Sequence, residues 1–549
     1  MRINRLVLTA ALAVILHGAW AAQPVPDYSA YILTPEAPAE PRINSAKVFG
    51  VRPGSPLLYR VAATGDRPMT FAAEGLPEGV TIDPQSGQMS GRIDSAGTYV
   101  VTLVASNDKG TCRRELRIEA GERIALTPPM GWNSWNCWGH SVSQEKVLSS
   151  ARALVDKGLA DYGWTYINVD DGWQGLRGGP ENALQPNSKF PDMKAMADEI
   201  HAMGLKLGIY SAPWVSTYAS HPGSYSDNPE GTYRWIEEGW RTDDYRALFP
   251  EGFDPKTFWQ HAAYSWVDAD SRQWAEWGVD YLKYDWRPND IYFTTEMRDA
   301  LRRTGRDIVY SLSNAAPFAD APQWAELANC WRTTGDIEDT WQSVTDIGFR
   351  PQERWAAFNG PGHWSDADML VVGMVGWGPE LHYTRLTPDE QYAHVTLWAL
   401  MASPMLIGCD IAAMDDFTLN LLCNFEVNDV LQDPLGMQAV PFHRDEQHEV
   451  YIKILEDGSL AVGLFNLSEE RLKLGFEPRT LGLWGDNIVV RDLWRQQDVA
   501  SVAAGGWFDT EVAPHGAAMY RLSPCNTRER QNYSPFYDMS APYRPVKVE

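Results

Sequence analysis

The order of hydrophobic and polar positions divides the chain into regions with different periodicity. Between residues 44 and 120, short apolar runs such as Val80–Ile82 and Tyr99–Val104 alternate with turn residues, which is typical of a small β-sandwich. From residue 121 to 425, β-prone runs alternate with amphipathic stretches at helical spacing. From residue 426 to 524 the helical period fades and short strands separated by turns return. The pattern predicts two β-sandwiches on either side of an α/β domain.

The central region contains eight candidate strands, each followed by a stretch that can form a helix or a loop. Eight such units over this length predict a (β/α)₈ barrel. A doubly wound sheet would instead call for a glycine-rich phosphate loop, and the sequence has neither G-x-G-x-x-G nor a P-loop. The candidate strands are Met130–Trp135, Tyr166–Asp171, Leu205–Tyr210, Val279–Asp285, Asp307–Leu312, Cys330–Thr334, His363–Asp366 and Pro404–Gly408.

The two ends of the chain have their own composition. Residues 1–21 resemble an export signal, with a basic start, an apolar run from Leu6 to Leu16 and an A-x-A site at Ala19–Ala21. A proline-rich linker follows over residues 22–43, and a polar tail fills residues 525–549. No later run reaches the roughly 18 apolar residues of a membrane span. We therefore expect a secreted or periplasmic protein that is not inserted in a membrane.

Composition narrows the range of functions. A net charge of −25 and a pI near 4.9 argue against nucleic-acid binding, which needs a basic surface. The 24 Trp and 23 Tyr exceed what a core requires, and flat rings stack well on sugar faces. The six cysteines are dispersed without a C-x-x-C pair, so a zinc site is not expected. An oxidising destination permits disulfide bonds, which we expect without being able to assign the pairs.

Carboxylates recur at the predicted ends of the barrel strands. One acid at a strand end is often a helix N-cap, and the pair Lys283 and Asp285, which share a strand face, could form a buried salt bridge. Several acids on one rim cost folding energy and need a reason. No histidine cluster or D-x-D-x-D loop supports a metal, and no cofactor is expected. Cleavage of a glycosidic bond does require paired carboxyl groups. The acids concerned are Asp170, Asp171, Asp285, Asp336, Asp366 and Asp368.

The motifs around these acids resemble glycoside hydrolase family 27, the family of α-galactosidases and α-N-acetylgalactosaminidases. The similar stretches occur in order and cover about residues 125–520. The resemblance implies a catalytic barrel followed by a β-sandwich. Residues 44–120 separately resemble the immunoglobulin-like modules of bacterial secreted enzymes. The family motifs lie at Thr127–Trp135, Asn168–Trp173, Gly204–Tyr210, Tyr281–Asp285, Trp331–Ile337, Ser365–Leu370 and Leu397–Pro404.

The resemblance also implies roles for individual residues. Asp285 is similar to the nucleophile and Asp336 to the acid/base of a retaining mechanism, for which the two carboxyl groups lie about 5–5.5 Å apart. We expect Lys283 to keep Asp285 ionised, and the surroundings of Asp336 to raise its pKa. Arg332 is expected to touch the sugar on the nucleophile side. The remaining sugar contacts implied by the family pattern are Trp135, Asp170, Asp171 and Asp368.

The sequence departs from the family pattern at three places. Gly172 and Arg287 stand where family members commonly carry cysteines. The segment Ser311–Pro317 replaces a Cys-Glu-Trp type of segment that reads the substituent at C2, so either an N-acetyl group fits there or Asn314 binds a hydroxyl. The stretch Tyr218–Tyr264, rich in aromatic residues, is expected to build subsites for the leaving group.

The leading hypothesis is an exported retaining exo-glycosidase that releases terminal α-linked galactose from oligo- or polysaccharides. A β-L-arabinopyranosidase is a close alternative, because that sugar matches galactose without C6. The altered segment at C2 leaves an α-N-acetylgalactosaminidase open. An alternative of another class is a glycan-binding protein without catalysis, which the presence of both catalytic carboxylates disfavours.

Overall fold

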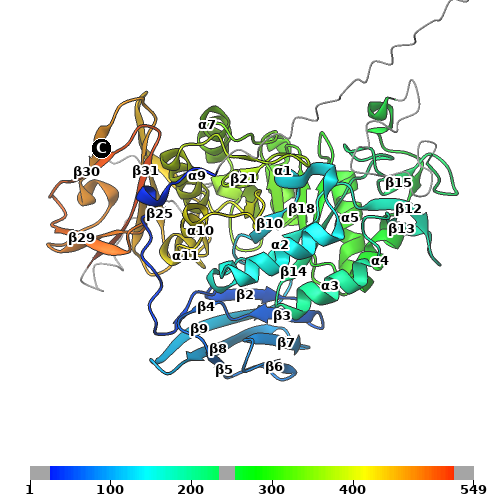
Figure 1. Ribbon diagram of the computed structural model, residues 1–549, viewed down its shortest axis with the longest axis horizontal. Helices are drawn as coiled ribbons and strands as arrows, with labels where there is room; N and C mark the ends of the chain where they lie inside the picture. Colours follow the sequence, from blue (N-terminus) through cyan, green and yellow to red (C-terminus); the bar gives the residue numbers. More distant parts are fainter. Residues whose placement is uncertain (1–24, 234–253, 525–549) are drawn as a thin grey trace, which may run out of the picture.

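The computed structural model describes residues 25–233 and 254–524, and these form three domains (Figure 1). An N-terminal β-sandwich, a central parallel (β/α)₈ barrel and a C-terminal antiparallel β-domain follow one another along the chain. The predicted fold class is confirmed. The expected export signal at residues 1–21 and the tail at residues 525–549 lie outside the described residues.

The barrel is built on a ladder of eight strands in the order β20-β19-β18-β17-β14-β11-β10-β23. All neighbours in this ladder pair in parallel. A parallel bridge between Leu370, just after β20, and Ile407 in β23 closes the ring. The strands are β10 (Met130–Asn133), β11 (Tyr166–Asn168), β14 (Lys206–Ser211), β17 (Tyr281–Asp285), β18 (Val309–Ser313), β19 (Cys330–Arg332), β20 (Trp364–Asp366) and β23 (Met405–Ile407).

Helices surround the barrel and return the chain from each strand to the next. Their starts carry caps of the usual kind: Asp290 accepts a hydrogen bond from Phe293 N at the start of α5, and Thr387 and Glu390 form a capping box at α9. The helices are α1 (Trp135–Trp138), α2 (Gln144–Asp156), α3 (Met193–Ala202), α4 (Val267–Trp277), α5 (Ile291–Arg303), α6 (Ala321–Leu327), α7 (Trp341–Gly348), α8 (Arg350–Glu353), α9 (Pro388–Leu400), α10 (Asp416–Leu422) and α11 (Phe425–Leu431).

The N-terminal β-sandwich lies against the amino-terminal ends of the barrel strands (Figure 1). Arg52 binds Asp307, just before β18, with its backbone N–H and its side chain at 2.9 and 2.6 Å. Arg60 donates to Asp161 at 2.9 Å. The sandwich consists of β1 (Arg42–Ile43), β2 (Val48–Val51), β3 (Pro56–Arg60), β4 (Ala63–Thr64), β5 (Thr70–Glu74), β6 (Val80–Ile82), β7 (Gln88–Arg92), β8 (Gly97–Ser106) and β9 (Thr111–Ala120).

The C-terminal domain packs on helix α9 of the barrel. Every residue of α9 except Asp389 is buried, because the helix lies between the barrel and the sheet containing β26 and β31. Trp494 donates its indole N–H to Thr396 of α9 at 2.9 Å. The domain consists of β24 (Val440–Arg444), β25 (His448–Ile454), β26 (Leu460–Asn466), β27 (Leu472–Phe476), β28 (Ile488–Asp492), β29 (Gln497–Val502), β30 (Phe508–Val512) and β31 (Ala517–Pro524).

The segment before the first domain, predicted as a linker, is described from residue 25 and runs along the barrel. A short 3₁₀ helix, η1 (Ser29–Tyr31), precedes two contacts to barrel helices: Leu33 N–H donates to the Tyr392 hydroxyl at 3.2 Å, and Thr34 N–H donates to Asn420 at 3.1 Å. The segment is therefore held against α9 and α10 by these hydrogen bonds.

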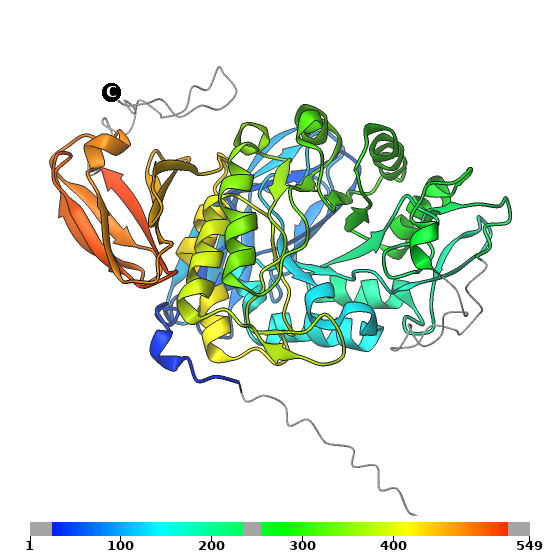
Figure 2. The ribbon, with the colours of Figure 1, turned by 90° about the horizontal axis from the view of Figure 1, so that it is seen from above.

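Additional short strands extend the loops at the carboxyl ends of the barrel. The hairpins β12 (Gln174–Gly178) with β13 (Ala183–Pro186), and β15 (Tyr225–Ser226) with β16 (Tyr264–Ser265), lie at the end of the molecule opposite the C-terminal domain (Figure 2). The pair β21 (Met374–Val375) and β22 (His382–Tyr383) follows β20.

The expectation of disulfide bonds is wrong for the residues that the structure describes. The five described cysteines are all free thiols, and Cys525 lies outside the described residues. They are spread over separate parts of the fold, and most of them fill core positions as small apolar side chains. The free cysteines are Cys112, Cys137, Cys330, Cys409 and Cys423.

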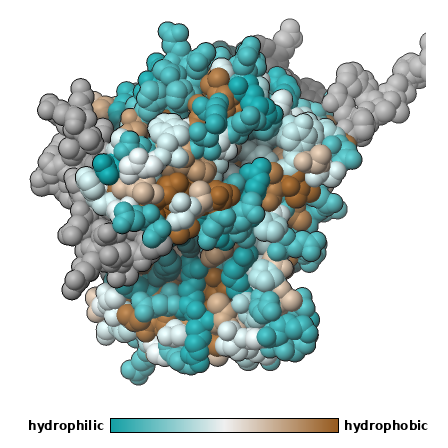
Figure 3. Space-filling view, turned by 90° about the vertical axis from the view of Figure 1, so that its left-hand side faces the viewer, coloured by the Kyte–Doolittle hydropathy of each residue, from teal (hydrophilic) through white to brown (hydrophobic). Residues whose placement is uncertain are grey.

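The outer surface is mainly polar. On the face shown in Figure 3, hydrophilic positions surround smaller hydrophobic areas. The exposed large apolar side chains of the C-terminal domain are Phe442, Trp484, Val499 and Trp507. In the described parts of the chain, none of the helices combines the length and the apolar composition that crossing a bilayer requires.

Gly208 in β14 tests how tightly the barrel interior is filled. A Cβ at this position would lie 1.9 Å from Asn168 Oδ1, and Asn168 is itself buried. We expect Gly208→Ala to destabilise the protein by about 1–3 kcal/mol, because the interior cannot expand. Gly121→Ala is the control, since a Cβ there has no atom within 4 Å. Urea denaturation measures both, and equal effects of the two substitutions would contradict the prediction.

Candidate active site

A cavity of about 310 Å³ opens at the carboxyl ends of the barrel strands. All nine candidate site residues line it, although they come from different strand ends and are far apart in the sequence. The structure therefore brings together the whole predicted set. These residues are Trp135, Asp170, Asp171, Lys283, Asp285, Asn314, Arg332, Asp336 and Asp368.

Asp285, the last residue of β17, is buried at the base of this cavity with 5% of its surface exposed. Oδ2 accepts a hydrogen bond from the Tyr210 hydroxyl at 3.0 Å. Oδ1 has no hydrogen-bond partner among the described residues. Burial raises the pKa of Asp285 to about 7, against the opposing effect of Lys283. One oxygen of this buried carboxyl group is thus held by Tyr210, and the other has no hydrogen-bond partner among the described residues.

Asp336 lies on the loop after β19, and its side chain is 65% exposed. Arg332 holds it through Nη2 at 3.1 Å from Oδ1. Burial would raise the pKa of Asp336, but the nearby Arg332 and Lys283 lower it more strongly, so the net shift is downward. The prediction that the surroundings raise the pKa of Asp336 is therefore wrong. Lys283 does lower the pKa of Asp285, as expected, but burial of Asp285 outweighs this effect.

Lys283 pairs with Asp170 and not with Asp285. Its ammonium lies 2.8 Å from Asp170 Oδ2, which also accepts a hydrogen bond from Asn133 at 2.8 Å. Burial opposes the charge on Lys283, but the neighbouring Asp170 and Asp285 raise its pKa overall. Lys283, two residues before Asp285, lies on the same face of β17, yet its direct partner Asp170 follows β11, which β14 separates from β17.

Asp171 is fixed by the loop that follows β14. Oδ1 accepts a hydrogen bond from the Thr217 hydroxyl and Oδ2 from the Ala219 backbone N–H, both at 2.8 Å. Burial raises the pKa of Asp171 to about 7, although these two donors favour the charged form. A carboxyl group with both oxygens occupied is rigid, so it can form further hydrogen bonds only in defined directions.

Arg332 also reaches Asp368, through the same nitrogen that contacts Asp336. Its Nη2 lies 2.8 Å from Asp368 Oδ2, which in addition accepts from the Ile337 backbone N–H at 2.8 Å. Arg332 therefore contacts the two acids after β19 and β20, and not the side of Asp285 as we expected. Burial raises the pKa of Asp368, and of the neighbouring Asp366 to about 6. Asp366 lies outside the cavity lining.

Two points at the cavity wall have left-handed backbone at non-glycine residues. Asn314 and Ala315, directly after β18, have φ of 69° and 76°, and Asp368 has φ of 77°. Left-handed backbone at non-glycine residues costs free energy and persists where the surrounding structure imposes it, often at functional sites. The strain at Asn314 lies in the segment that departs from the family pattern.

Tyr210, Tyr218 and Trp259 also line the cavity, and the sequence analysis did not single them out. Tyr210 ends a predicted barrel strand, so the strand-end rule that found the acids could have found it too. Tyr218 and Trp259 come from the irregular stretch between β14 and α4, and their ring centroids lie 4.8 Å apart. That stretch was expected to contact the leaving group, and residues 234–253 of it lie outside the described residues.

Paired carboxyl groups, adjacent cations and aromatic rings in a barrel mouth define a site for cleaving glycosidic bonds. The acids can supply a nucleophile and a proton donor, and the rings can cover apolar sugar faces. The site therefore places the protein in the class of glycoside hydrolases.

Comparison with protein families gives the same class. The family described as alpha galactosidase A matches residues 127–241 and 256–433, and the alpha galactosidase C-terminal β-sandwich domain matches residues 445–522. An Ig domain family matches residues 40–118.

Individual proteins support the family assignment. Alpha-galactosidase 3 of Arabidopsis thaliana is 37% identical over 74% of this chain and 84% of its own length. Alpha-galactosidase A of Cellvibrio japonicus is 32% identical over 73% of this chain and 93% of its own. A Bacteroides fragilis structure provisionally described as an α-galactosidase/melibiase has a TM-score of 0.76 and 32% identity, covering 90% of this chain and 99% of that one. The chain belongs to the α-galactosidase family, glycoside hydrolase family 27, and is a glycosidase.

The buried carboxyl groups predict that stability falls as the pH rises. Asp171 and Asp285 have folded-state pKa values of about 7, well above the value near 3.9 expected in the unfolded chain. The folded state therefore holds more protons between about pH 4 and pH 7, and its advantage is lost as the pH rises through that window. We expect a higher thermal midpoint at pH 5 than at pH 8.

Asp171→Asn should make the difference between the two midpoints smaller, because one of the titrating groups is removed. Asp94→Asn, at an exposed position, should leave the difference unchanged. Differential scanning calorimetry at both pH values measures this. A midpoint that is higher at pH 8 than at pH 5 would contradict the assignment.

Proposed function

We propose that this glycosidase releases terminal α-linked galactose from oligo- or polysaccharides, with Asp285 as nucleophile and Asp336 as acid/base. One observation carries the proposal: Asp285, whose carboxyl group is buried and held by Tyr210, lines the same cavity as the accessible Asp336. The names of the relatives supply the sugar, since most of those quoted are α-galactosidases.

In the first step, a carboxylate oxygen of Asp285 attacks the anomeric carbon of the sugar. The bond from that carbon to the leaving oxygen breaks, and Asp336 transfers its proton to that oxygen. A glycosyl ester on Asp285 results. The hydrogen bond from Tyr210 to Oδ2 keeps the carboxylate in the orientation needed for attack.

In the second step, Asp336 accepts a proton from a water molecule whose oxygen attacks the same carbon. The ester bond breaks and Asp285 is regenerated as a carboxylate. Two inversions retain the anomeric configuration. The exposure of Asp336 gives water the access that this step requires.

Both steps require one proton to be shared by the two carboxyl groups. Burial raises the pKa of Asp285 to about 7, and the nearby Arg332 and Lys283 lower the pKa of Asp336, so without a sugar the proton is favoured on Asp285. A bound sugar displaces water from Asp336 and favours its neutral form, while the ionised Asp285 remains close to Lys283. Substrate binding then shifts the proton to the residue that must donate it.

The other wall residues fix the sugar ring. Asp170 and Asp171 accept hydrogen bonds from the hydroxyl groups at C4 and C6, and Trp135 covers an apolar face. Because both acids are held by protein donors, each presents its remaining lone pairs in a set direction. A sugar that lacks one of these hydroxyls leaves a buried acceptor without a partner, which weakens binding.

The two proposed roles can be separated by their response to the leaving group. We expect Asp285→Asn to lower kcat/KM at least about 10³-fold on every aryl α-galactoside, because no ester can form. Asp336→Asn should lose about 10²–10⁴-fold with a poor leaving group and much less with an acidic phenol, which needs no proton. Steady-state kinetics with a series of aryl α-galactosides measures both.

Asp366→Asn is the matched control, as Asp366 is a buried acid outside the cavity lining. Turnover by Asp285→Asn close to that of the wild type would exclude the nucleophile assignment. Absence of turnover by the wild type would favour the glycan-binding alternative.

A second candidate sugar has support from a solved structure. The family 27 β-L-arabinopyranosidase of Geobacillus stearothermophilus has a TM-score of 0.59 and 30% identity over 73% of this chain and 97% of that one. The segment at Asn314 and Ala315 also leaves α-N-acetylgalactosaminide open, which is the activity named for a relative from Gallus gallus at 29% identity.

We expect the aryl α-galactoside to have the highest kcat/KM in a panel with the β-L-arabinopyranoside and the α-N-acetylgalactosaminide. The arabinoside lacks C6 and its hydroxyl, so it leaves one buried acceptor of the acid pair without a partner, at a cost of about 1–3 kcal/mol, or roughly 5–150-fold. Asp171→Asn should reduce the difference between galactoside and arabinoside. A higher kcat/KM for either competitor would replace galactose in the proposal.

The natural setting belongs to the same proposal. Residues 1–21 support export, so the substrate is expected to be a glycan outside the cytoplasm. Galactosides are neutral, and an acidic protein does not need charge attraction to bind them.

A further inference from the structure

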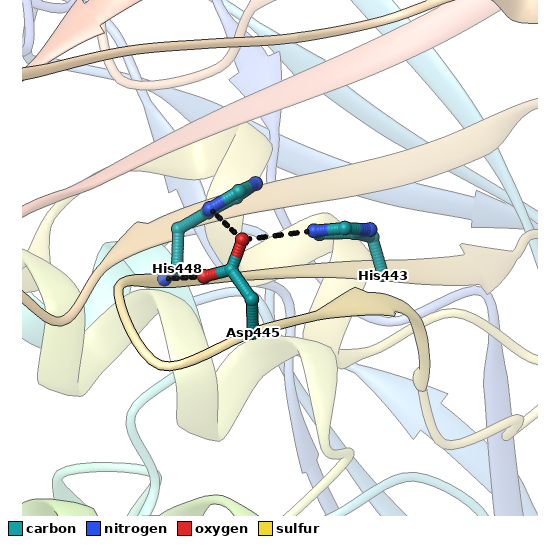
Figure 4. Close-up of side chains that lie close together, drawn as sticks. All are labelled: His443, Asp445 and His448. Atoms are coloured by element: carbon teal, nitrogen blue, oxygen red, sulfur yellow. Dashed lines mark hydrogen bonds and ion pairs between the residues drawn. The ribbon is translucent and has the colours of Figure 1, made fainter.

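The hairpin formed by β24 and β25 carries a group of side chains that the glycosidase reaction does not use. His443, Asp445 and His448 lie together at the end of this hairpin, in the C-terminal domain (Figure 4). Within residues 25–233 and 254–524, this is the one group of three or more such side chains whose ligand atoms could meet at a metal ion. None of the three lines the catalytic cavity.

The distances within the group suit tetrahedral coordination. Asp445 Oδ2 lies 3.3 Å from His443 Nε2 and 3.0 Å from His448 Nδ1, and all three ligand atoms lie within 4.8 Å of one another. Bonds of about 2.0–2.1 Å in a tetrahedral zinc site place neighbouring ligand atoms about 3.3–3.4 Å apart. Two of the three spacings therefore match with shifts of a few tenths of an ångström.

The backbone holds the carboxylate in place for such a site. Asp445 Oδ1 accepts hydrogen bonds from the backbone N–H groups of Gln447 and His448, at 2.8 and 2.9 Å. Oδ2 is thereby turned toward the two imidazoles (Figure 4). His443 Nε2 and His448 Nδ1 both face this oxygen, and the two rings lie close together with centroids 4.6 Å apart. Little conformational entropy remains to be lost when an ion binds.

The chemistry of the ligands selects the class of ion. Two imidazole nitrogens and one carboxylate oxygen suit zinc and similar transition metals, whereas magnesium and calcium prefer oxygen ligands alone. Three protein ligands leave one position open to water, which is the arrangement of an accessible site and not of a closed structural one. The side chains of His443 and Asp445 are 47% and 46% exposed, so an ion can reach them from solvent.

We propose that His443, Asp445 and His448 bind a divalent transition metal ion of the zinc class at the end of the β24–β25 hairpin. The ion links the edge strand β24 to β25, because its ligands come from both strands and from the turn between them. Each imidazole nitrogen that faces the carboxylate must be unprotonated when it binds the ion.

The position of the hairpin gives the ion a structural consequence. Arg444, between two of the ligands, bonds to Glu449 at 2.7 Å and forms an ion pair with Glu353 of the barrel helix α8. Fixing the hairpin therefore also fixes a contact between the C-terminal domain and the barrel. The bound ion is expected to stabilise the folded protein, and the free energy of unfolding should rise with the logarithm of the ion concentration once this exceeds Kd.

The test is titration of the chelator-treated, full-length protein with zinc chloride in a calorimeter. We expect one zinc ion to bind per chain. His443→Ala and His448→Ala should each weaken binding at least about tenfold, and magnesium chloride should give no comparable signal. Asp445→Asn removes the charged ligand and keeps the turn, because the amide oxygen can still accept hydrogen bonds from the two backbone N–H groups.

His382→Ala serves as the control, because His382 also pairs with an aspartate, Asp339, at 3.2 Å but lacks a second histidine. It should keep the zinc affinity of the wild type. Circular dichroism and turnover of a galactoside confirm that each variant is folded, independently of the metal. Cobalt(II) provides a second readout, since tetrahedral coordination gives intense visible absorption that the two histidine variants should lose. Absence of zinc binding by the wild type, or zinc affinity in His443→Ala and His448→Ala equal to that of the wild type, would overturn the proposal.

Discussion

The active site depends on the burial of several like-charged carboxyl groups beside two cations. Asp170, Asp285 and Asp368 each have 5% or less of their surface exposed. Without nearby positive charges, their carboxylates would repel one another and would be costly to bury. Lys283 and Arg332 supply that compensation from two strand ends, and protein hydrogen bonds satisfy many of the remaining oxygens. Burial of these carboxyl groups also raises the pKa of Asp285. The packing around the site and the protonation of Asp285 therefore have the same physical cause.

The other domains complete this scaffold. The N-terminal β-sandwich lies on the opposite end of the barrel from the cavity and contributes Arg52 and Arg60 to ion pairs with it. The C-terminal domain covers α9, whose apolar residues would otherwise face water. The hydrogen bond from the Trp398 indole to the Asp368 backbone carbonyl, at 2.7 Å, connects α9 with the cavity wall. Packing far from the cavity thus helps to hold its acids.

Much of the fold could be predicted from the sequence, because periodicity and strand-end chemistry are local signals. The eight barrel strands, the acids of the cavity and Lys283 were found in this way, whereas Trp135, Asn314 and Arg332 came from the resemblance to a family. The partner of Lys283 could not be predicted, since the pairing with Asp170 joins the ends of β17 and β11, which are not adjacent in the sheet. The pKa directions of Asp285 and Asp336 failed for a similar reason: burial is a property of the assembled cavity. The free cysteines show that a permissive environment does not bring thiols within bonding distance.

Helix α9 belongs to two cores at once. Its side chains pack in one continuous apolar cluster that includes barrel residues such as Trp132 and residues of the C-terminal domain such as Phe465 and Met519. The apolar core therefore continues across the domain boundary that follows α11. Replacing the C-terminal domain by another module would require one that is complementary to the outer face of α9. Removing the domain would expose the apolar side chains of that face to water.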